Sequence, residues 1–403
     1  MKGGTIVIGL DVGTTKICAV VAELLNGELE ILGVSTAPTT GLRKGVVVDI
    51  ESTVDSIKNA VETAGSLTGV QINAVNIGIA GGHIKGFNSY GAVGIKGKEV
   101  ANADIDRVID SAKAVYVPLD REVLHVLPTG YILDGQNGIK DPVGMMGVRL
   151  EANVYILTGA VTSVQNLLKC CEKVGLEVAD IVFEPLASAE AILTDEEREL
   201  GVAVVDIGGG TTDIILYKDG WLRNTSVLAI GGNHFTNDIA VGLRVTVSEA
   251  ERIKKSYGIA TTSLANDSAE IEIVQAGNER TILRKYLSEI IQPRSEELLD
   301  LIKTELMSCS GYDIASTGLV LTGGGSLLQG LDKMAEAVLG LPVRIGTPRY
   351  VTGGKEMVNN PMYATGVGLV LYGIESESKR GLYPDVFTGV FGKMRDWVKG
   401  IFR

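Results

Sequence analysis

Two short stretches of this sequence place a carboxylate before glycines and threonines, a combination that can bind phosphate groups. One runs from Asp11 to Lys16 (DVGTTK) and the other from Asp206 to Thr211 (DIGGGT), and each follows an apolar run typical of a strand. Glycine has no Cβ, so its backbone can turn tightly and approach a ligand closely. Successive amide N–H groups in such a turn can form a concavity that binds anions. A carboxylate at the end of the preceding strand, such as Asp206, suits Mg²⁺ bound through its water shell.

Either turn alone is equally well explained as an ordinary β-hairpin turn, because Asp and Gly are common there. The recurrence of the turn, and a third glycine run at 323–326, favour two similar lobes that bind one phosphate chain. Neither stretch is a Walker loop, because no Gly-Lys-Ser/Thr follows. Neither is a dinucleotide fingerprint, because no helical pattern follows the glycines directly.

The composition limits the class of protein. At 403 residues, of which 45% are hydrophobic, the chain is long enough for about two to four globular domains. A formal net charge of −12 argues against nucleic-acid binding, so no nucleic-acid partner is expected. The four cysteines lack metal or disulfide spacing, which indicates reduced thiols. The three histidines, His83, His125 and His234, are scattered, which favours structural roles.

The order of the expected elements repeats along the chain. The first phosphate turn is followed by a strand at 17–25, an Asn-Gly hairpin turn and a return strand, and the second turn is followed by a strand, an Asp-Gly hairpin turn and a strand. This recurrence predicts an α/β protein with two duplicated mixed-sheet lobes. A helix at 104–115 among short strands, such as 123–127 and 154–157, indicates an insertion in the first lobe. The acidic stretch 195–199 is typical of a solvated link between lobes.

These elements predict the domain boundaries. The predicted parts are a first-lobe core at 1–83 and 162–195, to which 355–374 returns; an inserted subdomain at 84–161; a second-lobe core at 196–230 and 303–354; an outer subdomain of the second lobe at 231–302; a flexible linker at 375–386; and an amphipathic helix at 387–403.

The final segment has the pattern of a helix that lies on a membrane. At about 100° per residue, its apolar side chains fall within an arc of roughly 140°. A helix docked on the protein's own core would explain this apolar face, but not the basic face on a chain of net charge −12. Lysine and arginine there suit anionic lipid. The residues expected to meet the membrane are Phe387, Phe391, Met394, Trp397, Val398, Ile401 and Phe402, with Lys393, Arg395 and Lys399.

The order of the motifs resembles that of the actin-like ATPase superfamily. Asp11–Thr15, Glu184–Pro185, Asp206–Thr211 and Gly323–Gly325 match, in turn, its first phosphate loop, connecting carboxylate, second phosphate loop and adenosine loop. The resemblance implies an actin-like two-lobed fold with ATP and Mg²⁺ between the lobes. It also changes the interpretation of the predicted helix at 247–257. On spacing alone its charged face is best explained as an ordinary surface ion pair, but the superfamily has an adenosine-contacting helix there.

The resemblance implies specific roles for these residues. Asp11 and Asp206 would hold the hydrated Mg²⁺ from opposite sides, and Glu184 would be the catalytic residue that orients the attacking water. Lys16 either adds a positive charge to the phosphates or faces solvent. Phosphoryl transfer needs mainly positioning and charge stabilisation, and the resemblance implies a slow Mg²⁺-dependent ATPase whose main role is assembly. The residues expected to contact the nucleotide are Gly13, Thr14, Thr15, Lys16, Gly208, Gly209, Gly210, Thr211, Gly231, Gly232, Glu251, Lys254, Lys255, Gly323, Gly324, Gly325 and Ser326.

Within this superfamily the chain is similar to the FtsA family of bacterial division proteins. The insertion after 81–86 (GGHIKG), the segment 289–299 (EIIQPRSEELL) and the basic tail carry this closer resemblance. It implies a peripheral protein on the cytoplasmic face of the cell membrane at the division septum, which polymerises and tethers FtsZ filaments to the membrane. The expected partners are the FtsZ C-terminal peptide, bound near Arg284 and Arg294, further copies of this chain, anionic membrane lipid and other divisome proteins.

Three other functions are compatible with parts of the pattern. A cytoplasmic scaffold of type IV pilus assembly shares the inserted subdomain, but the amphipathic tail argues against it. A chaperone-type ATPase carries a large substrate-binding domain after its lobes, whereas only a short segment follows Gly373 here. A small-molecule kinase needs an acceptor pocket with a general base, and no carboxylate besides Glu184 stands out for that role.

Overall fold

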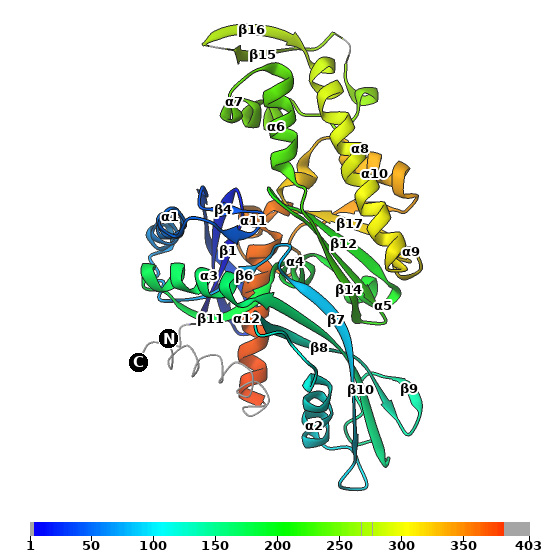
Figure 1. The fold of residues 1–403 in the computed structure, drawn as a ribbon. Coiled ribbons are helices and arrows are strands. Elements are labelled where there is room, and N and C mark those ends of the chain that lie inside the picture. The colour runs from blue at the N-terminus through cyan, green and yellow to red at the C-terminus, as the bar shows by residue number, and fades with distance from the viewer. Residues whose placement is uncertain (1–3, 267, 276, 383–403) are drawn as a thin grey trace.

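The computed structural model describes residues 4–266, 268–275 and 277–382 of the chain. Two five-stranded sheets of the same topology lie side by side, with helices α4 (Glu184–Ile192) and α12 (Ala364–Leu382) in the middle of the molecule (Figure 1). The first sheet has the order β11-β6-β1-β2-β3, and its strands are β1 (Thr5–Val12), β2 (Lys16–Leu25), β3 (Glu28–Pro38), β6 (Ala74–Ile79) and β11 (Glu177–Phe183). The second has the order β14-β13-β12-β17-β18, and its strands are β12 (Val202–Ile207), β13 (Thr212–Lys218), β14 (Trp221–Leu228), β17 (Leu319–Thr322) and β18 (Val343–Ile345).

The two sheets repeat one arrangement, as the duplicated motifs predict. In each, three consecutive strands pair antiparallel, and the two strands that follow add in parallel on the other side of the first strand. Helices α1 (Ile50–Thr68) and α3 (Val161–Val174) cover the outer face of the first sheet, and α8 (Arg284–Ser308) and α10 (Leu331–Leu339) lie against the second sheet (Figure 1). Alternate residues of β12 enter different cores, with Val204 in the first and Val205 in the second, because neighbouring strand residues point to opposite faces. This second sheet is therefore buried on both faces.

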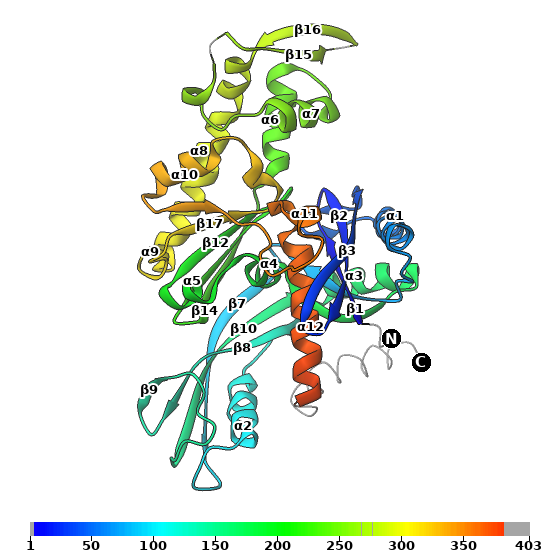
Figure 2. The ribbon, with the colours of Figure 1, turned by 180° about the vertical axis from the view of Figure 1, so that it is seen from behind.

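Two smaller units lie at opposite ends of the molecule, as Figures 1 and 2 both show. One is a four-stranded sheet of order β7-β10-β8-β9, formed by β7 (Lys85–Gly94), β8 (Arg121–Leu133), β9 (Gln136–Ile139) and β10 (Arg149–Ala160), with α2 (Asn102–Lys113) packed on it. The other contains α6 (Gly232–Leu243), α7 (Val247–Tyr257), β15 (Glu270–Gln275) and β16 (Asn278–Leu283). The remaining short elements are β4 (Leu42–Arg43), β5 (Val46–Val47), α5 (Asp195–Leu200), α9 (Gly311–Ile314), α11 (Lys355–Val358), η1 (Thr262–Leu264), η2 (Gly324–Leu327) and η3 (Pro361–Tyr363).

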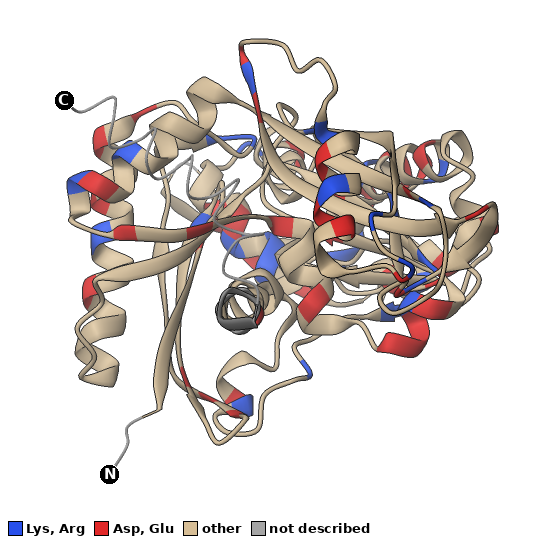
Figure 3. Cartoon of the chain, turned by 90° about the horizontal axis from the view of Figure 1, so that it is seen from below, with Lys and Arg blue, Asp and Glu red and all other residues tan. Residues whose placement is uncertain are grey.

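Charged residues of both signs are spread over many elements, as the colours of the ribbon seen from below show (Figure 3). In the part of the chain that the structure describes, no helix combines the length and the apolar character needed to cross a membrane. The expected amphipathic helix at 387–403 lies outside the described residues.

The structure refines three sequence-based expectations. Residues 195–199, expected as a solvated link, form helix α5, which has no buried residue and in which Thr194 and Glu197 form a capping box. Residues 375–382, expected in a flexible linker, continue helix α12 up to the last residue before the undescribed segment 383–403. The strands of the insertion are also longer than expected, because pairing within the sheet extends β8 and β10 beyond their most apolar residues.

Glycines allow helix α12 to approach its neighbours closely. A Cβ on Gly368 would lie 1.7 Å from the carbonyl oxygen of Ala187 in α4, and a Cβ on Gly9 of β1 would lie 2.3 Å from the carbonyl oxygen of Gly366. No real Cβ can occupy such positions unless the backbone moves. The close approach of α12 to α4 and β1 therefore depends on glycine at these positions.

We expect Gly368→Ala to lower the thermal unfolding midpoint clearly. Overpacking a buried contact costs about 1–3 kcal/mol, which exceeds the gain of about 1 kcal/mol from replacing a helical glycine by alanine. Gly94→Ala is the matched control, since the nearest atom to a Cβ there, the carbonyl oxygen of Val148, is 4.0 Å away. Equal midpoints for the two variants would contradict this account of the α12 contact.

Candidate functional site

The two glycine-rich turns have the same backbone geometry in the two lobes. Between β1 and β2 the amide of Gly13 donates to the carbonyl oxygen of Lys16 at 3.0 Å, and between β12 and β13 the amide of Gly208 donates to that of Thr211 at 2.9 Å. Each turn joins two antiparallel strands of a central hairpin. The sequence similarity of the two motifs thus corresponds to one local structure used twice.

The two turns meet face to face. A Cβ on Gly209 would lie 2.3 Å from Cγ2 of Thr15, and a Cβ on Gly210 would lie 2.9 Å from Oγ1 of Thr14. Thr14 also accepts a hydrogen bond from the amide of Gly45 at 3.0 Å. Side chains at 209 and 210 would push the lobes apart, so the glycines permit the contact.

Carboxylates from both lobes gather behind these turns. Asp11 and Asp213 are buried, and Asp206 and Glu184 are half-buried. Asp206 and Asp213 lie opposite each other in the β12–β13 pair, so their side chains share one face of the sheet. The Nζ of Lys16 lies 3.5 Å from Oδ2 of Asp11 and donates to the carbonyl oxygen of Met362 at 2.8 Å, so this lysine points into the site and not into solvent.

Burial and mutual repulsion raise the pKa of these acids. The pKa of Asp213 rises to about 8, mainly because it is removed from water and also because Asp206 is near. The pKa of Asp206 rises to about 6 through burial, despite a hydrogen bond from Ser188 Oγ at 2.7 Å. Burial and the charges of the neighbouring aspartates hold the pKa of Glu184 well above its ordinary value. Burial also raises the pKa of Asp11, although Lys16 opposes this effect.

Glu184 is the first residue of helix α4. Strand β11 ends at Phe183, which is the N-cap of the helix. The side chain packs against Gly78 of β6, where a Cβ would lie 2.7 Å from Cγ of Glu184. Glu184 therefore stands where α4 leaves the first sheet and lies close to both lobes.

The other predicted glycine segments close around the second turn. The amides of Gly232 and Asn233 donate to the carbonyl oxygens of Gly208 and Gly209 at 2.9 and 2.8 Å, so the start of α6 lies on this turn, with Gly231 packed beside it. A Cβ on Gly323 would lie 2.2 Å from Oδ1 of Asp206.

The residues after Gly323 also lie at the second turn. A Cβ on Gly325 would lie 2.3 Å from Cγ2 of Ile207, whereas one on Gly324 would meet open space. The hydroxyl of Ser326 donates to the carbonyl oxygen of Gly323 at 2.7 Å and holds the turn.

The charged face of α7 is engaged with the start of α6. Lys254 Nζ lies 2.7 Å from Oε2 of Glu251 and donates to the carbonyl oxygen of Gly232 at 2.9 Å, while Lys255 lies 3.2 Å from Glu251. Glu251 also accepts from Thr236 Oγ1 at 2.5 Å. The ion pair is real, but Lys254 is only 16% exposed and directly supports a segment of the site.

The two arginines assigned to a partner lie away from this cluster. Arg294 of α8 pairs with Asp238 of α6, with nitrogen–oxygen distances of 2.6 and 3.1 Å, and with Glu297. Arg284 donates to the carbonyl oxygen of Tyr257 at 2.8 Å and to Gln329 at 2.9 Å. Both guanidinium groups thus join elements within the outer part of the second lobe.

Asp213 is a site residue that motif reasoning missed. Asp206 and Asp213 flank a tight turn between two strands, and the antiparallel register that such a turn imposes puts them opposite each other. Counting residues across the hairpin would therefore have found Asp213. The membrane residues of the expected tail helix lie outside the described residues.

Comparisons with known proteins identify the family of this chain. The family model for cell division protein FtsA matches residues 203–368, and that for the SHS2 domain inserted in FtsA matches residues 81–158. Cell division protein FtsA of Pseudomonas aeruginosa is 44% identical, with 100% of this chain and 99% of that protein aligned. The proteins of the same name from Escherichia coli and Bacillus subtilis are 40% and 36% identical, over 98% and 94% of this chain and 96% and 86% of theirs.

Solved structures with low sequence identity share the fold. The PilM–PilN type IV pilus biogenesis complex aligns with a TM-score of 0.66, over 91% of this chain and 98% of that one. MreB5 of Spiroplasma citri bound to ADP aligns with a TM-score of 0.58, over 94% and 98%. Both are 17% identical to this chain, so they show the actin-like fold alone. The full-length relatives, in contrast, establish that this chain belongs to the FtsA family of bacterial cell division proteins.

Proposed function

We propose that this protein binds ATP with Mg²⁺ between its lobes, assembles with further copies of itself, and tethers FtsZ filaments to the cytoplasmic face of the cell membrane at the division septum. The observation that carries the nucleotide site is the convergence of Asp11, Asp206, Asp213 and Glu184 behind two matching glycine turns. Membership of the FtsA family supports the division role.

The negative charge of the cluster and one free carboxylate oxygen fit a divalent cation held through water, since no three His, Cys, Asp or Glu side chains among the described residues are arranged to bind a metal directly. Oδ1 of Asp213 is buried and has no hydrogen-bond partner among the described residues. The four acids have Lys16 as a nearby positive charge, and their raised pKa values reflect negative charge that lacks compensation. Asp11 and Asp206 are the residues that would hold Mg²⁺ through water, and the ion would supply charge stabilisation for phosphoryl transfer.

The residues of the two turns would bind and position the phosphates. Amides of Thr14 and Thr15 in the first lobe, and of Gly209 and Gly210 in the second, lie where the turns meet. Glu184 would orient the attacking water, which makes slow hydrolysis the expected activity. MreB5 of Spiroplasma citri, a protein of the same fold, has been solved bound to ADP and bound to AMPPNP, which supports nucleotide binding by this chain.

Self-association and partner binding rest on the family. Actin-like chains that contact each other head to tail form filaments, because such a contact does not close. The outer part of the second lobe, around α8, is the proposed docking surface for the FtsZ C-terminal peptide. Arg294 forms an ion pair with Asp238. We therefore infer that Arg294 holds α8 against α6 and so stabilises this surface, in addition to contacting the peptide. Other divisome proteins are further proposed partners.

We expect Asp206→Asn to weaken the affinity for a fluorescent ATP analogue with Mg²⁺ by about tenfold or more, equivalent to about 1.4 kcal/mol. The amide keeps the shape of the side chain and can still accept from Ser188, but it lacks the charge that would hold the cation. Glu172→Gln, at an exposed carboxylate far from the turns, is the matched control. Unchanged affinity in Asp206→Asn, measured by titration, would contradict the assignment of the site.

The buried charge also predicts a pH-dependent stability in the absence of nucleotide and Mg²⁺. The pKa of Asp213 is about 8 in the folded protein, whereas in the unfolded chain the carboxyl has the ordinary aspartate pKa of about 3.9. The folded state therefore retains a proton that the unfolded state releases, and stability falls as the pH rises through this interval. Asp213→Asn removes this loss, so its stability advantage over the wild type should grow from pH 4 to pH 8 and then stay constant. Denaturant midpoints measured across this range test the expectation, and an advantage that does not change with pH would contradict it.

The membrane role rests on the sequence of the tail. Each lysine or arginine near an anionic surface contributes about 1 kcal/mol, and one such helix binds reversibly, so assembly would strengthen attachment by joining many tails. Residues 387–403 carry the apolar and basic faces that this binding requires.

We expect removal of residues 387–403 to release the protein from vesicles with anionic lipid while nucleotide affinity is unchanged. In the same flotation assay, full-length protein should carry FtsZ with the vesicles, and the truncated protein should not. Vesicles without anionic lipid are the control for the basic face. If the truncated chain floats as well as the full chain, the tail is not the anchor.

A further inference from the structure

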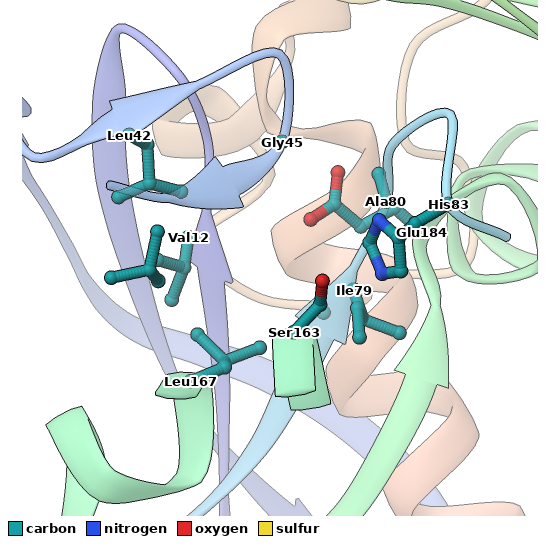
Figure 4. Close-up of a pocket in the computed structure, with 11 residues that line it drawn as sticks. Val12, Leu42, Gly45, Ile79, Ala80, His83, Ser163, Leu167 and Glu184 are labelled. Carbon is teal, nitrogen blue, oxygen red and sulfur yellow. The ribbon is translucent and has the colours of Figure 1, made fainter. Parts of the chain in front are cut away.

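A small cavity lies next to the start of the first phosphate turn, with Val12 in its lining. It has a volume of about 10 Å³, and its lining includes Gly45, Ala80, His83, Ser163 and Glu184 (Figure 4). The turn at 44–45 connects it to both lobes, because the amide of Gly45 donates to Thr14 and the Cα of Lys44 lies 3.2 Å from where a Cβ on Gly210 would be. A polar cavity of this size has room for about one water molecule, which needs two to four polar partners.

His83 is held by its backbone, while its ring is left without a partner. Gly81, with φ of +123°, turns the chain after β6, and the carbonyl oxygen of His83 accepts from Nη2 of Arg121 at 2.8 Å. The ring lines the cavity, yet neither Nδ1 nor Nε2 has a hydrogen-bond partner among the described residues. An unpaired buried polar group costs about 1–3 kcal/mol, so an imidazole with two unpaired nitrogens facing a polar cavity indicates a partner such as water. Burial and the nearby Arg121 lower the pKa of His83, which keeps the ring neutral, with one nitrogen able to donate and one able to accept.

Glu184, the first residue of helix α4, reaches the same cavity. Figure 4 shows its carboxylate and the His83 ring on the lining, with the hydroxyl of Ser163 facing the same space. A carboxylate, an imidazole and a hydroxyl supply the partners that one ordered water needs. A single carboxylate would leave the water free to rotate, whereas hydrogen bonds to two fixed groups would set the orientation of its O–H bonds and lone pairs.

We propose that His83 is a positioning residue that, with Glu184, holds the water molecule that attacks the terminal phosphate. This inference rests on the proposed nucleotide site. In the step, the water oxygen forms a bond to the γ-phosphorus as the bond from that phosphorus to the β–γ bridging oxygen breaks, and ADP leaves. The proton lost by the water passes to the Glu184 carboxylate and from there to the released phosphate. His83 keeps its own protons throughout and acts through the orientation of the water.

The test compares the full-length wild type with His83→Ala, His83→Gln and Glu184→Gln. Affinity for the fluorescent ATP analogue is measured by titration, and phosphate release is measured in a single turnover at saturating ATP and Mg²⁺. We expect His83→Ala to keep the wild-type affinity within about twofold and to lose about tenfold or more in the rate of release, since misplaced reactants lose rate by such factors. His83→Gln should restore much of the rate, because an amide can also donate and accept.

The alternative is that His83 only packs the turn after β6. In that case both variants would release phosphate at the wild-type rate, or both would show a lower rate of release and a lower thermal unfolding midpoint. Either result would overturn the inference. A wild type that binds ATP without hydrolysing it would overturn it too, while leaving the nucleotide site intact. Absence of nucleotide binding by the wild type would instead remove the proposed function, and this inference with it.

Discussion

Repulsion among carboxylates is the constraint on which the rest of this structure depends. Asp11 comes from the first lobe, Asp206 and Asp213 from the second, and Glu184 from the helix between them. With Lys16 as their nearby cation, these groups disfavour full ionisation, and their pKa values rise. A cation held between the lobes would attract acids on both sides. Cation binding and lobe closure are then linked, because a ligand shifts a conformational equilibrium by the difference in its affinity for the two states.

The duplicated fold places these charges at the centre of the molecule and fixes their positions by close contacts between the two lobes. The matching hairpins bring the two turns face to face, and glycine at 209 and 210 permits the contact. Helix α5 joins the lobes through two ion pairs, because Arg198 meets Glu190 of α4 at 2.7 Å and Glu197 meets Arg344 of β18 at 2.7 Å. A segment whose composition is typical of a solvated link is thus an ordered connection. Any rotation of one lobe relative to the other must therefore bend or displace α4, α5 and α12.

Much of this could be predicted from the sequence because the signals are local. The turn chemistry of 11–16 and 206–211, and the strand–hairpin pattern after each, are set by neighbouring residues, and the structure has them as expected. Other features depend on distant partners. The ion pair of Glu197 with Arg344 and that of Arg294 with Asp238 join residues far apart in the chain. His83 was expected to be structural because no nearby residue marks it, and only the fold brings it to Glu184.

The inserted subdomain connects the site to the second lobe. Arg121, at the start of β8, donates to the carbonyl oxygens of His83 and Thr158, at 2.8 and 2.7 Å, and so fixes the insertion to the edge of the cavity that His83 lines. On its other side, Tyr155 Oη lies 3.2 Å from Asn224 Oδ1 and accepts from the amide of Thr225 at 3.1 Å, both in β14 of the second lobe. A change in the angle between the lobes must therefore break the Tyr155 contacts or carry the insertion with it. On the function proposed above, either outcome would change the surface that this subdomain offers to a neighbouring chain, and nucleotide state would then alter assembly without direct contact between nucleotide and neighbour.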